Sequence, residues 1–446
     1  MLLLLRYVTG QGTIYDRCWG GATMSDGKGL VRQASKRTAT DAAARRERFL
    51  APFAHLREQV EQAKNGDVYA LYPTLETGQG KSGSVIVGGA AAISLVANDY
   101  LGLSGDPRVA DAANSAIDQF GVSRCASPVA GGYTELHKTL ERRLADFTGQ
   151  QEAVVLASGY QANLGAIGGL LRPGDLAVCD LLSHASIVDG VRLAGAELRY
   201  FQHNNAEHLD AVLDTAAADR RVLVVVEGVY SADGDLAPLP EICRVAHRHD
   251  AFVMVDEAHS LGVVGANGRG ATELHDVADS VDVIVGTMSK SIGTIGGFIC
   301  SDRAIVDIIR HNARSLIFSA ALPPPVAAGA IRSLEIMRTE PARRAELWAN
   351  THHLLAGLRA HGFDTLSSET PVIPILVGDQ LRTLMFSRGL ARAGVLVCPA
   401  IPPMVQPHMS RIRMHVTARH DSDAIDRVLA ALDAVAREVG VPRTGG

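Results

Sequence analysis

The sequence predicts an α/β fold: a large domain built on a mostly parallel seven-stranded sheet, followed by a smaller C-terminal α+β domain. Between residues 153 and 301, seven short apolar runs alternate with amphipathic or turn-rich stretches, a rhythm typical of parallel strands joined by helices. Farther along, a long charged helix is followed by shorter strands and a closing helix. We expect an N-terminal arm at 1–95, a large domain at 96–335 and a small domain at 336–446.

The composition narrows the class of protein. The 446-residue chain is 47% apolar and 20% charged, with a formal net charge of -5, which is typical of a soluble globular protein. It lacks the basic excess that a nucleic-acid partner requires. No stretch approaches the roughly 20 apolar residues of a membrane span. We therefore expect neither nucleic acid nor a membrane as a partner.

The spacing of the cysteines and the N-terminal sequence indicate the cellular compartment. The six cysteines are far apart, with no CxxC pair and no nearby histidines at metal spacing, which favours free thiols and no metal site. The opening MLLLLRYVTG has too short an apolar run for an export signal. Met24 is an alternative start, because residues 1–23 carry no pattern. These observations predict a cytoplasmic protein.

The N-terminal arm contains two predicted elements. RRERFLAPFAHLREQVEQA (45–63) reads as a charged helix, and SVIVGGAAAISLVA (84–97) reads as a hairpin. TGQGKSG (77–83) resembles the end of a phosphate-binding loop, but Leu75 stands where the first glycine belongs and no strand precedes it. We interpret this segment as a turn.

The predicted strands of the large domain are the seven apolar runs. They are AVVLA (153–157), LAVC (176–179), ELRYF (197–201), VLVVVE (222–227), AFVMVD (251–256), VDVIVG (281–286) and GGFICS (296–301). A helix is expected over about 326–362. The small domain should then contain strands at PVIPILVG (371–378), GVLVCPA (394–400) and SRIRMHV (410–416), and a final helix.

Polar residues gather behind the predicted strands, where ligands bind in open α/β sheets because loops and helix N-termini converge there. The residues that follow the strands are Ser158, Gly159, Tyr160 and Gln161, then Ser183 and His184, Gly228 and Ser231, Asp256 and His259, and Thr287, Ser289 and Lys290. One edge of the sheet should therefore carry an acid, two histidines, a lysine and several hydroxyls.

This set of residues fits pyridoxal 5'-phosphate (PLP) chemistry. Lys290, in the Gly-rich turn GTMSKSIGTIGG, is placed to hold the cofactor as a Schiff base and to move a proton at the substrate Cα. Asp256 is placed to keep the pyridine nitrogen protonated. The helix start in SGYQAN and the hydroxyl of Thr287 suit a phosphate. The His184 ring is suited to stack on the cofactor, while His259 and Ser231 are suited to bind its ring oxygen.

Six segments together carry a family resemblance: SGYQANLG, SHASIVDG, EGVYSADGD, VDEAHSLGVVGANGRG, GTMSKSIGTIGGF and FSAALPP. With these motifs the sequence resembles the α-oxoamine synthases, PLP enzymes of fold type I. The motif residues are most similar to those of the serine palmitoyltransferase group. The match extends from NDYLGL (98–103) to SRIRMHVTARH (410–420), about three quarters of the chain.

The resemblance implies a role for each matching residue. Lys290, His184, Asp256 and His259 would be catalytic, with Ala258 facing His184 across the cofactor ring. Ser158, Gly159, Tyr160, Thr287 and Ser289 would surround the phosphate, and Ser231 would join His259 at the ring hydroxyl. Ser319 would reach the phosphate of a second subunit in a homodimer whose active site lies at the interface. Asn98 and Arg413 would contact the substrate, although Arg411 shares the strand face of Arg413.

The implied reaction is a decarboxylative condensation of an amino acid with an acyl thioester, carried by coenzyme A or a carrier protein, to give an α-amino ketone. The sequence departs from the family at two places. Pro128 stands where members commonly carry an arginine, with Arg124 four residues earlier, and Ile401 stands where an arginine often precedes the prolines. The resemblance therefore leaves both substrates open.

Other interpretations compete with this one. A fold-type-I aminotransferase or lyase would share the PLP site without using a thioester. A non-catalytic subunit would lack the lysine, whereas Lys290 and His184 are both present. Asp256 alone would be read as a helix cap, and both arginines as the solvated face of a strand. Glu257 is assigned no role, since a structural hydrogen bond explains it equally well.

Overall fold

The computed structural model describes residues 39–66, 71–78, 80–217 and 219–444. Cys18, Met24 and the opening apolar run lie outside these residues. The chain divides into two compact units, residues 1–66 and 67–446, and each is described by itself. The domain boundaries expected at residues 95 and 335 stay predictions.

The first unit contains α2 (Ala39–Leu50), a 3₁₀ turn (Ala51–Phe53) and α3 (Ala54–Asn65). The single helix expected over residues 45–63 is therefore interrupted. Pro52 lies in the 3₁₀ turn, where its missing N–H and its ring prevent the α-helical hydrogen-bond pattern from continuing.

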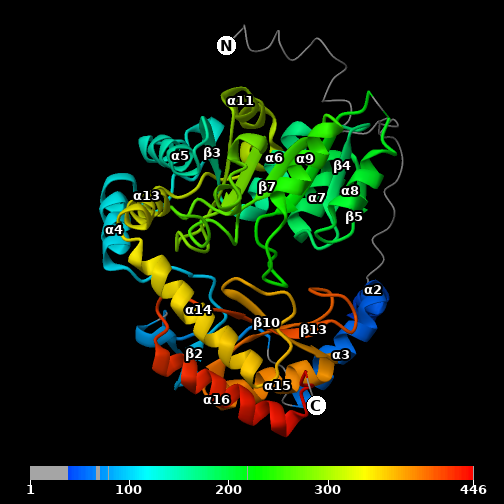
Figure 1. The fold of residues 1–446 in the computed structure, drawn as a ribbon, viewed down its shortest axis with the longest axis vertical. Coiled ribbons are helices and arrows are strands. Elements are labelled where there is room, and N and C mark those ends of the chain that lie inside the picture. Colours follow the sequence, from blue (N-terminus) through cyan, green and yellow to red (C-terminus); the bar gives the residue numbers. More distant parts are fainter. Residues whose placement is uncertain (1–38, 67–70, 79, 218, 445–446) are drawn as a thin grey trace. The chain divides into compact units, whose positions relative to one another are not determined.

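The second unit is built on a seven-stranded sheet, which confirms the α/β expectation (Figure 1). Its strands are β3 (Glu152–Leu156), β4 (Leu176–Asp180), β5 (Glu197–Phe201), β6 (Val222–Glu227), β7 (Phe252–Asp256), β8 (Val283–Thr287) and β9 (Gly297–Ser301). They lie in the order β3-β9-β8-β7-β6-β4-β5. β9 runs antiparallel to both of its neighbours, and the other neighbouring pairs are parallel.

Helices cover both faces of this sheet, because successive strand side chains point to opposite sides. Val154 belongs to the apolar cluster on one face and Val155 to the cluster on the other. The first face packs against α6 (Gly159–Leu170), α7 (Ala185–Ala194) and α11 (Arg303–Asn312). The second packs against α5 (Glu135–Thr148), α8 (Ala206–Leu213), α9 (Leu239–Arg248) and α13 (Pro324–Thr339), and α4 (Pro107–Phe120) lies beside α13.

Two three-stranded sheets complete the unit. The antiparallel sheet β10-β13-β12 joins Val372–Gly378, Ser410–His415 and Cys398–Ala400. The expected hairpin forms β1 (Ser84–Val87) and β2 (Ala90–Ser94), and β2 also pairs with β11 (Val395–Leu396). α15 (Gln380–Arg392) packs on β13, and α16 (Ser422–Val439) packs on both α15 and α14 (Ala342–Ala360).

A second expected helix was also wrong in extent. The helix predicted over 326–362 is two helices, α13 and α14, separated at Glu340–Pro341. Pro341 removes an N–H donor and disfavours helical geometry at Glu340, so the first helix ends there. Among the described residues, no helix combines the length and apolar character needed to cross a membrane.

Candidate active site

The carboxyl ends of β3, β6, β7 and β8 and the N-termini of α6 and α7 meet at a cavity of about 290 Å³. The cavity brings together residues singled out from the sequence: Ser158, Gly159, Tyr160, His184, Asp256, His259, Thr287, Ser289 and Lys290. Asn163, Ser186, Glu227 and Ala258 also line it. The edge of the sheet that the sequence predicted as a site is therefore a real concavity.

Asp256 is fixed by two hydrogen bonds at the end of β7. Asn163 Nδ2 donates to Asp256 Oδ2 at 2.7 Å, and the backbone N–H of Ala258 donates to Oδ1 at 2.9 Å. The carboxylate is buried. Asn163 lies on α6 and also donates to Ser186 Oγ on α7 at 2.9 Å. Two helices therefore help to orient one carboxylate.

Lys290 lies in the loop 288–296 that returns from β8 to the antiparallel β9. The loop is closed by the Met288 N–H, which donates to Gly296 O at 2.9 Å. Gly296 has φ +133°, and a Cβ there would lie 2.2 Å from Met288 Cε, so the turn requires glycine. Burial lowers the pKa of Lys290 to about 8, although the charges of Asp256 and Glu227 oppose that shift. Much of the amine is then neutral near pH 8, as a nucleophile must be.

Glu227 is a site residue that sequence reasoning missed. It ends β6 opposite Asp256 in the strand register, and its Oε1 accepts the His184 N–H at 2.6 Å. Burial raises the pKa of Glu227 to about 8, and the nearby negative charge of Asp256 adds to the effect. The signal was available in VLVVVE, where one carboxyl ends an otherwise apolar run.

A buried tyrosine orients His259. Tyr100 OH lies 2.7 Å from His259 Nδ1, and both residues are buried. Burial raises the pKa of Tyr100, so the phenol keeps its hydrogen and directs it at Nδ1. Burial also lowers the pKa of His259, so the ring stays neutral. Nε2 then carries the ring hydrogen and is the nitrogen left to donate to a ligand.

The start of α6 is suited to bind an anion. Ser158 is the N-cap and accepts the Gln161 N–H at 3.2 Å, which leaves the neighbouring first-turn N–H groups without helical partners. A Cβ at Gly159 would lie 2.8 Å from Thr287 Cβ, so glycine allows close approach of helix and strand. Thr287 Oγ1 lies 2.8 Å from Ser289 Oγ.

Some predicted residues lie outside this cavity. Ser231 and Arg413 line a neighbouring cavity of about 730 Å³ that shares His184 with the first. Ser319 lines neither of these two cavities, but its Oγ accepts from Gln161 Nε2 at 3.0 Å. Asn98 lines neither of them, and its buried Oδ1 accepts no hydrogen bond from the residues that the structure describes.

Asp180, His203 and Asp235 form a cluster beside the loop that carries His184. His203 Nδ1 lies 2.9 Å from Asp180 Oδ1, and His203 Nε2 lies 2.8 Å from Asp235 Oδ2. Asp180 Oδ1 also accepts the Leu182 N–H at 2.8 Å. Burial lowers the pKa of His203, but the hydrogen bonds and charges of the two carboxylates outweigh it and raise the pKa to about 10. The cluster anchors the loop that carries His184.

Glu257 has a structural role. It is fully buried, and its carboxylate accepts the N–H groups of Ala271 and Thr272 at 2.8 Å each. It therefore holds the start of α10 (Ala271–Leu274) rather than facing the cavity.

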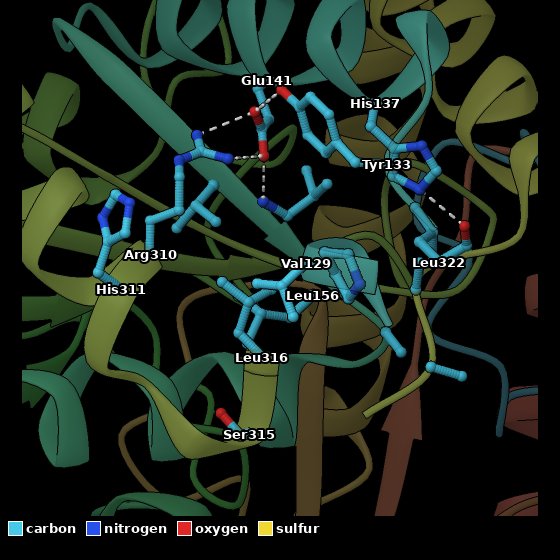
Figure 2. Close-up of a pocket in the computed structure, with 16 residues that line it drawn as sticks. Val129, Tyr133, His137, Glu141, Leu156, Arg310, His311, Ser315, Leu316 and Leu322 are labelled. Atoms are coloured by element: carbon cyan, nitrogen blue, oxygen red, sulfur yellow. Dashed lines mark hydrogen bonds and ion pairs between the residues drawn. The ribbon is translucent and has the colours of Figure 1, made fainter. Parts of the chain in front are cut away.

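A larger cavity, of about 410 Å³, lies elsewhere in the unit (Figure 2). Its main polar group, Glu141, accepts from Tyr133 OH at 2.6 Å, from Arg310 Nη2 at 3.0 Å and from Val155 N–H at 3.1 Å. His137 bonds to Leu322 O at 2.7 Å. Pro128, one of the two departures from the family pattern, also lines this cavity.

The residues of the 290 Å³ cavity, which contains Lys290 and Asp256, fit PLP. An amine, a carboxylate, an imidazole and a helix N-terminus surround one space, which is the donor set that the cofactor needs. Several buried polar atoms at or beside the cavity also have no hydrogen-bond partner among the described residues: Gln161 Oε1, Asn163 Oδ1, Ser183 Oγ and Arg413 Nε. Unpaired buried groups of this kind indicate a place for a polar ligand.

Comparison with known proteins agrees with this geometry. Residues 90–432 match the family "Aminotransferase class I and II". The chain is 36% identical over 387 residues to 8-amino-7-oxononanoate synthase of Thermoanaerobacter pseudethanolicus, covering 86% of this chain and 98% of that protein. It is 39% identical over 363 residues to serine palmitoyltransferase of Bacteroides ovatus, covering 81% and 92%.

The same likeness holds among solved structures. Serine palmitoyltransferase from S. paucimobilis, with a bound PLP-myriocin aldimine, aligns with a TM-score of 0.86 at 36% identity, covering 88% of this chain and 99% of that one. The expected PLP-dependent fold type I is thereby confirmed. The chain belongs to the class I and II aminotransferase family and, within it, to the α-oxoamine synthases.

Proposed function

We propose that this chain condenses an amino acid with an acyl thioester, with loss of CO₂, to release an α-amino ketone. The observation that carries the proposal is the meeting of the Lys290 amine and the Asp256 carboxylate at one cavity, in a chain of this family. When bound, PLP supplies the electron sink that stabilises negative charge at the substrate Cα.

Lys290 is the proposed attachment point of the cofactor and the base that removes the Cα proton. A pKa of about 8 supports both roles, because the amine must exchange between its neutral and charged forms during turnover. Asp256 is proposed to hold a proton on the pyridine nitrogen. Its hydrogen bonds from Asn163 and Ala258 keep the carboxylate in one orientation without blocking that role.

The remaining lining residues are proposed to position the cofactor. His184 and Ala258 would contact opposite faces of the ring, and the Nε2–H of His259, with Ser231, would bind the ring oxygen. The phosphate would be bound by Ser158, Gly159, Tyr160, Thr287 and Ser289. The N-terminus of α6 supports this assignment, since it offers N–H groups and a favourable dipole to an anion.

Arg413 is the proposed partner of the amino acid's carboxylate, with Asn98 as a further substrate contact. Arg413 Nη1 donates to Ser231 O at 3.2 Å, while its buried Nε has no hydrogen-bond partner in the described part of the chain and remains able to donate. Arg411 is less suited, because it pairs with Asp233. Their different partners support the choice of Arg413 over Arg411 in this proposal.

We further propose a homodimer in which Ser319 reaches the phosphate site of a second copy. The neighbouring Phe318 is 73% exposed, and contact with a second copy would bury its ring. Light scattering should give the mass of a dimer, and a monomer that is fully active would contradict the proposal. We place the reaction in the cytoplasm because the five described cysteines are free.

The test of function uses free thiol release. Pantetheine is the arm that coenzyme A and carrier proteins share, so acylated pantetheine can stand for either donor. We expect thiol release that depends on an amino acid, and CO₂ release in equal amount. Amino-group transfer to a keto acid without thiol release would instead favour the aminotransferase alternative.

Lys290→Ala tests the central assignment. We expect loss of borohydride-trapped cofactor and a fall in turnover of at least about 10³-fold, with the fold retained, because among the described lining residues Lys290 is the one lysine that can act as the proposed base. Far-ultraviolet circular dichroism checks the fold. Retained turnover would contradict the assignment.

A further inference from the structure

The cavity next to His184 bears on which acyl group is used. This cavity, of about 730 Å³, shares His184 with the cofactor cavity and contains Arg413, the proposed carboxylate partner. The acyl thioester must approach the reacting carbon from a space that adjoins the cofactor site. This cavity is larger than the cofactor cavity and meets that condition.

The lining is apolar over much of its extent. Most of its apolar side chains come from two segments, the loop before α7 with the first residue of that helix, and the end of β12 with the loop that follows it: Leu181, Leu182, Ala185, Ala400, Pro403, Met404, Val405 and Met409. Leu181 and Met404 are 49% and 52% exposed, respectively. Large apolar side chains that are exposed beside a cavity suit contact with an apolar ligand.

The two arginines in the lining differ in whether their guanidinium groups already have partners. Arg411 Nη1 pairs with Asp233, and Arg411 Nε donates to Met409 O at 2.9 Å, so this cation is neutralised. Arg413 has a free donor at Nε. Among the described lining residues, Arg413 is therefore the one permanent cation with unused capacity, which is enough for one carboxylate.

An acyl chain that ends in a carboxylate would place a second negative charge here. With Arg413 bound to the amino acid, that charge would meet the apolar side chains and, among the described lining residues, no cation with unused capacity, so desolvating it would be unfavourable. The two relatives differ in this respect. A product called 8-amino-7-oxononanoate retains a carboxylate at the end of its chain, whereas a palmitoyl group ends in a methyl.

We propose that this cavity receives the acyl chain and selects an uncharged, apolar acyl thioester over one that ends in a carboxylate. The inference rests on the proposed condensation and adds the class of its acyl donor. It assigns Leu181, Leu182, Met404 and Met409 to acyl recognition.

Two probes of equal length test the proposal on the holoenzyme. They are octanoyl-pantetheine and 7-carboxyheptanoyl-pantetheine, supplied with a mixture of the proteinogenic amino acids other than cysteine. Thiol release gives kcat/KM for each probe. We expect a value at least about tenfold higher for the octanoyl probe, since apolar contacts of even one methylene discriminate by about this factor.

The outcomes separate the two proposals. Equal values, or a preference for the carboxylated probe, would overturn the selectivity and leave the condensation standing. Absence of thiol release from both probes would refute the condensation, and the inference would fall with it.

A cation added to the cavity gives a second test. Met404→Lys should raise the ratio of carboxylated to octanoyl turnover severalfold, because the new ammonium can pair with the terminal carboxylate. Met385→Lys is the matched control, since Met385 is also exposed, at 43%, but does not line this cavity. An unchanged ratio in Met404→Lys, or an equal rise in Met385→Lys, would contradict the assignment.

Discussion

The cavity in Figure 2, of about 410 Å³, and the cavity at the carboxyl ends of β6, β7 and β8, of about 290 Å³, differ in how their polar groups are satisfied. They are called here the larger and the smaller cavity. In the larger cavity Glu141 accepts from three protein donors, and Arg310 supplies the opposite charge. In the smaller cavity, the pKa of Lys290 is lowered to about 8 and the pKa of Glu227 is raised to about 8. The larger cavity therefore has the character of a structural cluster, and the smaller one that of a reactive site.

Asp256→Asn should give the largest effect on the reactive side. We expect the cofactor still to bind while kcat falls about 10²-fold or more, because an amide cannot hold the pyridine nitrogen protonated. Stopped-flow absorbance and turnover measure the two effects. Asp282→Asn is the matched control, since Asp282 accepts the Val253 N–H at 2.7 Å at the opposite end of β7. A similar fall in kcat for both variants would mean that the loss does not depend on the place of Asp256 at the cavity.

Glu141→Gln tests the structural side. The change leaves Arg310 without its counter-charge and weakens the set of three hydrogen bonds, so the free energy of unfolding should fall by about 3 kcal/mol. Turnover at a temperature where the variant is folded should stay near the original value. Denaturant unfolding and thiol release measure these. A large loss of kcat at full folding would show that the larger cavity takes part in catalysis.

Glu227→Gln sharpens the comparison through pH. The folded-state pKa of Glu227 is raised to about 8, so its contribution to stability is complete below pH ~4.5 and is lost as pH rises through 8. The glutamine variant lacks this loss. Its Tm relative to the original protein should therefore increase between pH 5 and pH 9, by the equivalent of about 1 kcal/mol or more. A relative Tm that stays flat would mean that the carboxyl is not perturbed.

His203→Gln should show a pH-dependent effect of the opposite sign. The folded-state pKa of His203 is raised to about 10, so its contribution is complete below pH ~6.5 and is lost as pH rises through 10. We expect a destabilisation of about 1–2 kcal/mol at pH 6.5 that shrinks toward pH 10. Thermal unfolding across this range measures it. A penalty that is constant with pH would mean that the imidazole acts only by packing.

The sheet and most of the cofactor cavity could be predicted because both depend on local patterns. Apolar runs identify buried strands, and the residues after them must gather at one edge, which is how Lys290 and Asp256 were found. The break at Pro341 was also encoded locally, although the charged pattern across it hid the end of α13. Other features depend on contacts between distant residues, and these could not be predicted.

Glu227 and the two arginines illustrate that limit. A carboxyl at the end of VLVVVE was visible, but its pairing with the His184 N–H depends on how two separate loops pack. Strand alternation put Arg411 and Arg413 on one face correctly. Only the position of Asp233, on another segment, distinguishes the paired guanidinium from the one with a free donor.

The reversed direction of β9 has a consequence for motion. A parallel pair would need a long crossover connection after Lys290, whereas here the loop that carries Lys290 is a tight return between two hydrogen-bonded neighbours. Hydrogen bonds from Met288 N–H to Gly296 O and from Thr294 N–H to Met288 O close that return. The Lys290 amine is thus anchored on a return between two paired strands, and we expect deuterium uptake at these two amides to report opening of the sheet itself.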